Sequence, residues 1–228
     1  MERVEFWEKI FPFKPVWDYL DGSRCKYAFR GKKDSWHRND KTSIPLQFKT
    51  LHEFKVYFKR HPDTTTFFVS GSRFFFFEVD ITDYLAETSA NRPPNTPPAT
   101  RSCACQATNQ CCDMCWVEVL RAPLIACLDY CVRIHRLKQV VPLFSGRRGF
   151  WILIGDTLDW DDEARQSFLN RVPAYIDRGV SEQPDHLMKV PFTPHHETGR
   201  LAVPIIDAHT FVPSQSETIC REMIEKIK

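Results

Sequence analysis

The sequence lacks the features that would place the chain in a membrane or outside the cell. No apolar run approaches the roughly 20 residues that a membrane-spanning helix needs. The opening segment, MERVEFWEKIFPFKPVW, has acidic residues among its aromatics and lacks the apolar core and small-residue cleavage site of a signal peptide. Internal repeats are also absent. We therefore expect a soluble intracellular protein that has no membrane partner.

The chain also lacks a strong excess of charge of one sign. Its 31 basic and 29 acidic residues leave a net charge of +2, which is smaller than the basic excess usual in nucleic-acid-binding domains. Contacts with phosphate must therefore come from local clusters of basic residues. At 228 residues and 43% hydrophobic, the composition is that of a globular protein with one core or two small ones.

Cysteine, by contrast, is abundant. Five of the nine cysteines crowd into positions 103–115, which is typical of a metal-binding knob rather than of a disulfide framework, so we expect a reducing compartment. A closed tetrahedral zinc site needs four thiolates, and the set predicted to supply them is Cys103, Cys105, Cys112 and Cys115. Cys111 is an alternative to one of them. Cys127 and Cys131 lie one helical turn apart, and we interpret them as core residues.

The hydrophobic pattern predicts a mixed α+β fold around a sheet. Two phenylalanine-rich runs in residues 64–81, broken by Ser-Gly-Ser, favour strands because aromatic and β-branched residues suit them. The run VVPLFSGRRGFWILIGD predicts a hairpin with a basic turn, and LAVPII a short strand. Residues 87–100 contain four prolines and no apolar period, which indicates a loop.

Helices are predicted in four places. Leu51–Arg60 carries apolar residues at helical spacing, and 161–172 is a second helix. Residues 116–138 have helical character, with Pro123 as a kink or as the true start. Ser214 to Glu217 matches a capping box that opens a helix toward the C-terminus.

Glu78 and Asp80 are the first candidates for catalytic residues. Side chains at positions i and i+2 of a strand share one face, so the two carboxylates project together while Phe77 and Val79 point to the other face. Such a pair repels itself unless a metal, a basic group or a proton compensates, and magnesium is typically held by one or two carboxylates plus substrate phosphates. Taken alone, the pair is better explained as a solvated strand end than as a metal site.

Four motifs in a fixed order resemble the small catalytic subunit of archaeo-eukaryotic primases. They span roughly residues 74–205 and read RFFFFEVDITDY, CCDMCW, FSGRRGFW and HLMKVPFTPHHETGRLAVPI. The N-terminal run SRCKYAFRGKKDSWHRN also resembles the shortened, late-expression-factor type primases of baculovirus-like insect viruses. The resemblance implies a single α+β primase catalytic domain over 1–228, with a zinc knob inserted at 101–116.

The resemblance also implies roles for individual residues. Asp177 would complete a site with Glu78 and Asp80 that holds two Mg²⁺ or Mn²⁺ ions, although without the resemblance it is a turn residue. A Gly-rich turn with a hydroxyl and two guanidinium groups suits a triphosphate. The implied nucleotide-binding residues are Ser145, Arg147, Arg148, Lys189, His195 and Arg38. Arg200 either joins them or pairs with an acid.

Two positions depart from the family pattern. Glu78 stands where the family has aspartate, and Trp151 stands where it has a histidine expected to touch the triphosphate. The long helical insertion that larger relatives carry between SGRRG and the third acid is also missing, because Asp177 follows Gly149 by only 28 positions.

We therefore expect a primase that makes short RNA primers from NTPs on single-stranded DNA. Mg²⁺ or Mn²⁺ would serve catalysis and Zn²⁺ structure, and a large subunit or helicase-like protein would be the partner. A nuclear location rests on the resemblance alone. Two alternatives stay open, a catalytically inactive zinc-containing replication scaffold and a repair or bypass polymerase that uses dNTPs.

Overall fold

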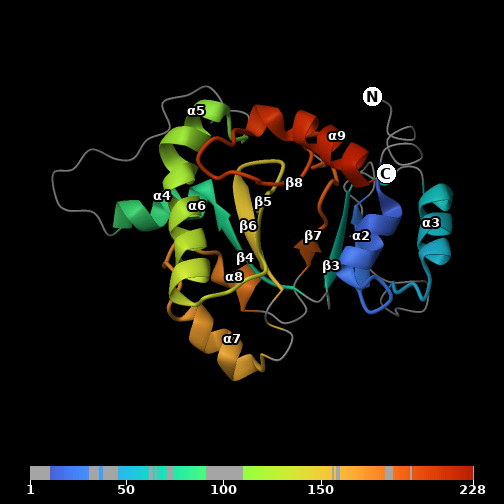
Figure 1. Ribbon diagram of the computed structural model, residues 1–228, viewed down its shortest axis with the longest axis horizontal. Helices are drawn as coiled ribbons and strands as arrows, with labels where there is room; N and C mark the ends of the chain where they lie inside the picture. The colour runs from blue at the N-terminus through green and yellow to red at the C-terminus, as the bar shows by residue number, and fades with distance from the viewer. Residues whose placement is uncertain are drawn as a thin grey trace.

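The computed structural model describes most of the chain, namely residues 11–30, 36–37, 46–61, 64, 66–70, 74–90, 110–155, 157, 160–182, 187–195 and 197–227. In that part, helices flank two four-stranded antiparallel sheets (Figure 1). The predicted mixed α+β class is confirmed, but the strands form two sheets where one was expected. Across the same residues, no helix has both the length and the apolar character needed to cross a bilayer.

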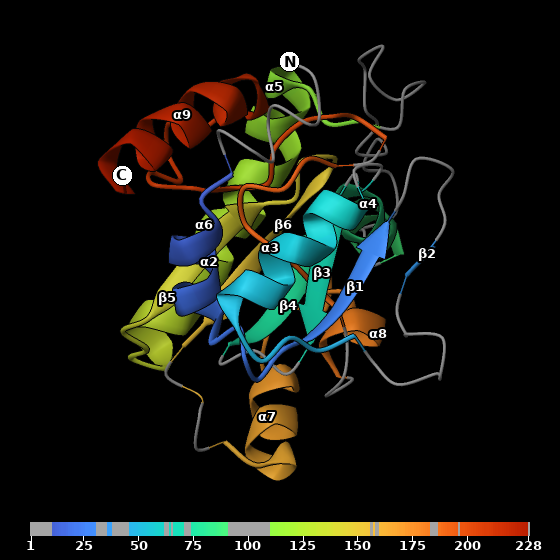
Figure 2. The same ribbon diagram turned by 90° about the vertical axis from the view of Figure 1, so that its right-hand side faces the viewer.

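The first sheet has the order β2-β1-β3-β7. Its strands are β1 (Lys26–Arg30), β2 (Trp36–His37), β3 (Thr66–Ser70) and β7 (Met188–Lys189). The predicted helix at Leu51–Arg60 is confirmed as α3, whose Phe54 and Phe58 rings pack edge-on against Phe67 of β3. Helix α2 (Phe13–Leu20) lies beside α3 at this end of the molecule (Figure 2).

The second sheet has the order β4-β6-β5-β8 and contains the predicted basic hairpin. Its strands are β4 (Phe75–Asp80), β5 (Val140–Phe144), β6 (Gly149–Ile154) and β8 (Val203–Pro204). The two phenylalanine-rich runs do form strands, but β3 and β4 belong to different sheets. Burial alternates along β4 with period two, as a strand with one covered face requires.

A helical segment at 113–134 lies against β5 and β6 (Figure 1). It consists of α5 (Asp113–Cys115), α6 (Arg121–Asp129) and two π-helical stretches, Trp116–Leu120 and Tyr130–Ile134. Pro123 lies in α6 just after the first π-helical stretch, so the proline neither ends nor begins the segment.

Three predicted boundaries are corrected. Residues 87–90 belong to helix α4 (Ile81–Ala90) rather than to the predicted 87–100 loop, and the rest of that segment lies outside the described residues. The 161–172 helix is α7 (Asp162–Leu169), which Asp161 caps through the Ala164 N–H. The 116–138 helix ends at Ile134.

The predicted capping box at Ser214 is wrong. The Ser214 hydroxyl and N–H both donate to the carboxylate of Asp113, at 2.5 and 2.9 Å, so this side chain joins the C-terminal segment to α5. A short 3₁₀ turn (Pro213–Gln215) instead leads into α9 (Ser216–Ile227).

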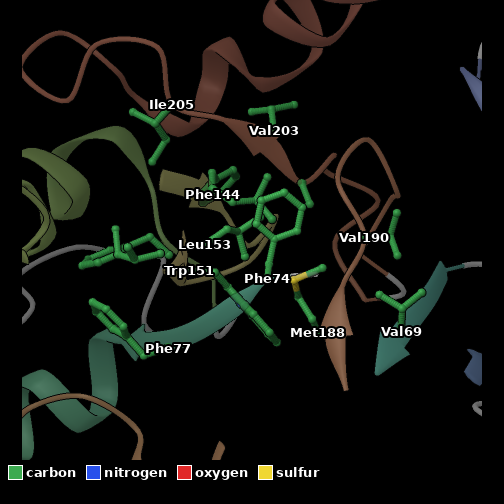
Figure 3. Packing of buried hydrophobic residues seen from close by; sticks show 14 of the residues in the cluster. Val69, Phe74, Phe77, Phe144, Trp151, Leu153, Met188, Val190, Val203 and Ile205 are labelled. Carbon is green, nitrogen blue, oxygen red and sulfur yellow. The ribbon is translucent and has the colours of Figure 1, made fainter. Parts of the chain in front are cut away.

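Both sheets share one hydrophobic core. Figure 3 shows side chains from the first sheet, such as Val69 and Met188, in the same packed region as Trp151 and Leu153 of the second. The core continues under the 113–134 helical segment through Trp116, whose side chain is fully buried.

Trp116 should be among the most costly core residues to truncate. Its ring lies 5.1 to 6.3 Å from those of Phe144, Phe150 and Phe211. We expect Trp116→Ala to lower the free energy of unfolding by about 3–5 kcal/mol, because it leaves a cavity that the sheet cannot close. Urea denaturation measures the change. The neighbouring Val117, 42% exposed, is the control, and Val117→Ala should stay within about 0.5 kcal/mol; equal losses would contradict this packing.

Candidate active site

The acidic pair lies at the end of β4, on one face of the second sheet. Glu78 and Asp80 are both partly buried. Phe77 and Val79 alternate with them along the strand and are fully buried on the opposite face. The strand register places Glu78 directly opposite Trp151 and Asp80 opposite Gly149. Gly149 is required there, because a Cβ atom would lie 2.3 Å from the Val79 carbonyl oxygen.

The environment of Glu78 strongly disfavours its charge. The pKa of this carboxyl is raised to about 8, first by burial and then by the charges of Asp80, Asp177 and Asp83, whereas the charge of Lys189 acts to lower it. The pKa of Asp83 is also raised, first by burial and then by Asp80 and Asp177. Four carboxyl groups therefore act on one another at this end of β4.

Asp80 already has partners for both carboxylate oxygens. Arg148 donates through Nε to Oδ2 at 2.5 Å, and Thr82 donates to Oδ1 through its N–H and its hydroxyl, at 2.8 and 2.6 Å. The ion pair is partly shielded from water, since 15% of the Asp80 side chain and 24% of the Arg148 side chain is exposed. This guanidinium is thus held at the acidic pair by a charge-assisted bond.

Asp177 reaches the same place by a different route. Its N–H donates to the Glu78 carbonyl oxygen at 2.9 Å, although the two residues lie 99 positions apart. The carboxylate caps helix α8 (Arg178–Ser181), where Oδ1 accepts from the Val180 N–H at 3.1 Å. Asp177 is thus a capping residue, as the turn interpretation predicted, and its backbone lies beside the acidic pair; its role as a metal ligand stays a prediction.

The carboxylates suit a divalent cation in type, but they are not arranged around one. Carboxylate oxygens are the ligands that Mg²⁺ prefers, and a cation would relieve the repulsion that raises the pKa of Glu78. Among the residues that the structure describes, however, no three Asp, Glu, His or Cys side chains converge closely enough to hold a metal ion. The Asp80 carboxylate instead accepts from Arg148, and the Asp177 carboxylate accepts from the Val180 N–H.

The basic turn between β5 and β6 lies next to the acidic pair. The Ser145 hydroxyl accepts from the N–H groups of Arg147 and Gly149, at 3.3 and 3.2 Å, which closes the turn. Arg147 forms an ion pair with Glu197 at 2.7 Å. The structure therefore brings Ser145 and both arginines of the SGRRG motif to one corner with Asp80.

Lys189 connects the two sheets at this corner. It belongs to β7 of the first sheet, is only 2% exposed, and donates through Nζ to the Ser145 carbonyl oxygen at 2.9 Å. Its charge also lowers the pKa of Glu78, which places it near the acidic pair. A buried ammonium group is tolerated here because it has both an acceptor and nearby carboxylates.

His195 lies on a hairpin that faces the basic turn. We call this hairpin, residues 193–195 and 197–202, the TGR hairpin; Pro194 pairs with Leu201, and the His195 N–H donates to the Arg200 carbonyl oxygen at 2.8 Å. The imidazole Nδ1 accepts from the Glu197 N–H at 3.2 Å. In the neutral ring the proton is then on Nε2, which makes that nitrogen a donor.

Trp151, the departure from the family histidine, is part of the core. It is 5% exposed and its ring stacks on Phe76 with centroids 5.1 Å apart. Because it lies opposite Glu78 in the register, the two atypical residues are cross-strand neighbours on one face.

The cysteines can be described only in part. Cys112 caps α5, its Sγ accepting from the Cys115 N–H at 3.4 Å, so these two thiols share the first turn of one helix. Cys103, Cys105 and the nucleotide-site candidate Arg38 lie outside the described residues. Cys127 and Cys131 are fully buried, as predicted for core residues, and burial raises the pKa of each thiol to about 12.

Sequence reasoning missed several members of this corner. Asp83 lies in the first turn of α4, and its position three residues after Asp80 was the available signal. Thr198 and Glu197 contact the basic turn through the Gly146 carbonyl oxygen and Arg147. Among the described residues, Arg200 forms no ion pair with an acid. Its guanidinium donates to the Cys111 carbonyl oxygen at 2.6 Å.

Comparisons with known proteins show a likeness of fold to one solved domain and no match by sequence. No protein-family model matches the sequence, and no curated protein matches it significantly. The structure resembles the polymerase domain of Mycobacterium tuberculosis Ligase D in complex with DNA, with a TM-score of 0.54 and 10% identity over 97% of this chain and 88% of that chain. At this identity the likeness shows a shared fold.

Two structures of the primase RepB′ are weaker matches. One has a TM-score of 0.44 and 6% identity, over 94% of this chain and 62% of that chain. The other, the catalytic domain in complex with initiator DNA, has a TM-score of 0.38 and 6% identity, over 100% of this chain and 96% of that chain. The conclusion on the fold rests on the Ligase D domain.

Glu78 should make the free energy of unfolding fall as pH rises. A glutamate that titrates near 4.5 when unfolded and near 8 when folded binds more protons in the folded state between these values, so stability is lost across that window. Glu78→Gln should lose this dependence on pH. Near pH 8 its free energy of unfolding should exceed that of the wild type by about 1–3 kcal/mol. This is less than the full pKa shift implies, because the carboxyl keeps some contact with water.

Urea denaturation at several pH values, with EDTA present, measures this difference. Glu222→Gln on the exposed side of α9 is the control and should follow the wild-type profile. Parallel profiles for Glu78→Gln and the wild type would show that Glu78 is ionised at neutral pH.

Proposed function

We propose that the chain is the catalytic subunit of a DNA primase of the archaeo-eukaryotic type. It would synthesise short RNA primers from NTPs on single-stranded DNA, with Mg²⁺ or Mn²⁺ as the catalytic cofactor, in nuclear or viral DNA replication. The single observation that supports this best is the meeting of the acidic end of β4 with Arg148, Lys189 and the SGRRG turn. Carboxylates for metal and cations for phosphate are the two groups that nucleotidyl transfer requires.

Glu78, Asp80 and Asp177 would hold the metal ions. When bound, two such ions activate the primer 3′-hydroxyl and stabilise the leaving pyrophosphate. Before that, the protein must rearrange, because Asp80 is paired with Arg148. Once the carboxylate turns to a cation, the same guanidinium is placed to pair with a triphosphate oxygen. Binding of metal and of nucleotide is therefore linked through this ion pair.

The remaining basic groups would bind and orient the triphosphate. Lys189 supplies a buried ammonium group and His195 an Nε2 donor. Arg147 is paired with Glu197, a partly exposed carboxylate that a phosphate can replace. The side chains of Lys189 and His195 are held by hydrogen bonds with backbone atoms, so these two donors would need little reorganisation when charge develops on the phosphates.

DNA and a protein partner complete the proposal. The Ligase D polymerase domain was solved in complex with DNA. A net charge of +2 gives this chain little general attraction for a polyanion. A large primase subunit or a helicase-like protein would supply the remaining contacts with the template DNA.

One assay separates the candidate functions. The purified protein is incubated with single-stranded template, Mn²⁺ and labelled NTPs or dNTPs, with and without a candidate partner. Short RNA products support a primase. Extension of primers with dNTPs alone would indicate a repair or bypass polymerase, which the Ligase D fold makes the second candidate. A folded protein that forms no product in any condition would be the inactive scaffold.

Asp80→Asn should reduce primer synthesis by at least about a hundredfold. Asparagine keeps the shape and can still accept from Thr82, but it lacks the charge that a metal requires. Rates are measured at saturating Mn²⁺, and circular dichroism checks the fold. Asp162→Asn, at a side chain that is 87% exposed on α7, is the matched control and should retain full activity. Synthesis by Asp80→Asn at the wild-type rate would refute the metal role.

We also propose a structural Zn²⁺ held by Cys112 and Cys115, together with Cys103 and Cys105 or Cys111. The two described thiols lie on one helical turn and fit a thiolate site in type. Metal analysis of protein purified without chelator should find about one zinc per chain.

Replacing both Cys112 and Cys115 by serine should remove the zinc, because a tetrahedral site cannot lose two ligands. Cys127→Ser should keep it, since that thiol is buried in the core. Equal zinc content in the two variants would exclude these ligands.

A further inference from the structure

The TGR hairpin and the basic turn lie face to face, and besides the Arg147–Glu197 ion pair they make contacts that involve backbone atoms of the turn. The Thr198 hydroxyl donates to the Gly146 carbonyl oxygen at 2.6 Å and accepts from the Arg200 N–H at 3.1 Å. Gly146 has a φ of +82°, and a Cβ atom there would lie 2.7 Å from the Arg200 carbonyl oxygen. The two turns thus fit together only with glycine at position 146.

The same contacts extend to the end of the cysteine-rich segment. The Cys111 N–H donates to the Arg147 carbonyl oxygen at 2.9 Å, and the Arg200 guanidinium donates to the Cys111 carbonyl oxygen at 2.6 Å. Arg200 therefore binds the residue that in turn binds Arg147. Cys111 is fully buried, so its carbonyl oxygen depends on protein donors rather than on water.

We propose that Thr198 and Arg200 are positioning residues for the proposed nucleotide site. They join three segments that are distant in sequence, namely Cys111, the SGRRG turn and the hairpin that carries His195. The proposal rests on the proposed function, because its consequence is the placement of Arg147, Arg148 and His195 for a triphosphate. Neither Thr198 nor Arg200 needs to touch the nucleotide for this role.

The geometry explains why two residues of such different chemistry act together. The Thr198 hydroxyl fixes the backbone at Gly146, just before the two arginines, and the Arg200 guanidinium fixes Cys111, which binds the backbone at Arg147. Two successive peptide groups of the turn are thereby held from the same hairpin. Orientation errors of about 1 Å in groups that position a substrate are costly to catalysis.

The test measures nucleotide affinity directly. ATP with Mn²⁺ is titrated into wild-type protein, Arg200→Ala, Arg200→Lys, Thr198→Val and Thr198→Ser by calorimetry, and Mn²⁺ binding alone is followed by electron paramagnetic resonance. Arg200→Ala should weaken ATP binding about tenfold and Thr198→Val several-fold, as expected for loss of bonds that hold a site. Lysine at 200 and serine at 198 keep a donor and should restore much of the affinity. Mn²⁺ binding without ATP should not change.

The controls separate positioning from folding and from direct contact. Thermal unfolding of each variant is recorded, and Arg133→Ala, at a side chain that is 78% exposed, should match the wild type. In primer synthesis, the loss should appear as a higher KM for NTP with a smaller change in kcat.

Three results would overturn the proposal. Unchanged ATP affinity in folded Arg200→Ala and Thr198→Val would show that the contacts serve stability alone. A loss in Arg200→Ala with normal affinity in Thr198→Val would make Arg200 a direct ligand. No binding of ATP by the wild-type protein would instead refute the proposed function, and this inference with it. If Arg200→Ala does not fold, the ATP affinities of Arg200→Lys, Thr198→Val and Thr198→Ser decide between these outcomes.

Discussion

Compensation of charge at the end of β4 is the constraint on which the candidate site depends. Glu78, Asp80, Asp83 and Asp177 repel one another in a partly buried place, where such repulsion is strong. The folded chain compensates this repulsion in two ways. Arg148 pairs with Asp80, and Lys189 lies near Glu78. In addition, the pKa of Glu78 is raised, so its carboxyl keeps the proton at neutral pH. A site balanced in this way responds to any added cation, because the cation competes with both the proton and the guanidinium.

The position of Lys189 shows how the architecture serves that balance. The acids belong to the second sheet, but this lysine comes from β7 of the first, and its ammonium reaches the Ser145 carbonyl oxygen across the junction. The two sheets therefore meet at the charged corner rather than only through their apolar core. A likeness to the Ligase D polymerase domain at 10% identity fits this arrangement, because packing and hydrogen bonds can keep a fold after most side chains have changed.

Local patterns in the sequence predicted the parts of the site that depend on neighbours in the chain. The period-two burial of β4, the SGRRG hairpin and the α3 helix all follow from spacing over a few residues. Contacts between distant segments could not be predicted that way: Asp177 beside Glu78 and Ser214 on Asp113 depend on packing. The resemblance to primases supplied Asp177, Lys189 and His195 as candidates, and only the structure gives their partners. The zinc knob and Arg38 stay predictions.

Glu78 and Trp151, the two departures from the primase pattern that the sequence resembles, are cross-strand neighbours in the structure. They face each other across β4 and β6, so whatever occupies one position limits the space and the polarity at the other. The indole stacked on Phe76 fills the face with apolar surface, which adds to the burial that raises the pKa of Glu78. Glu78 therefore lies opposite a buried indole, whereas Asp80 lies opposite a glycine, so the two carboxylates have different surroundings on the same face of β4.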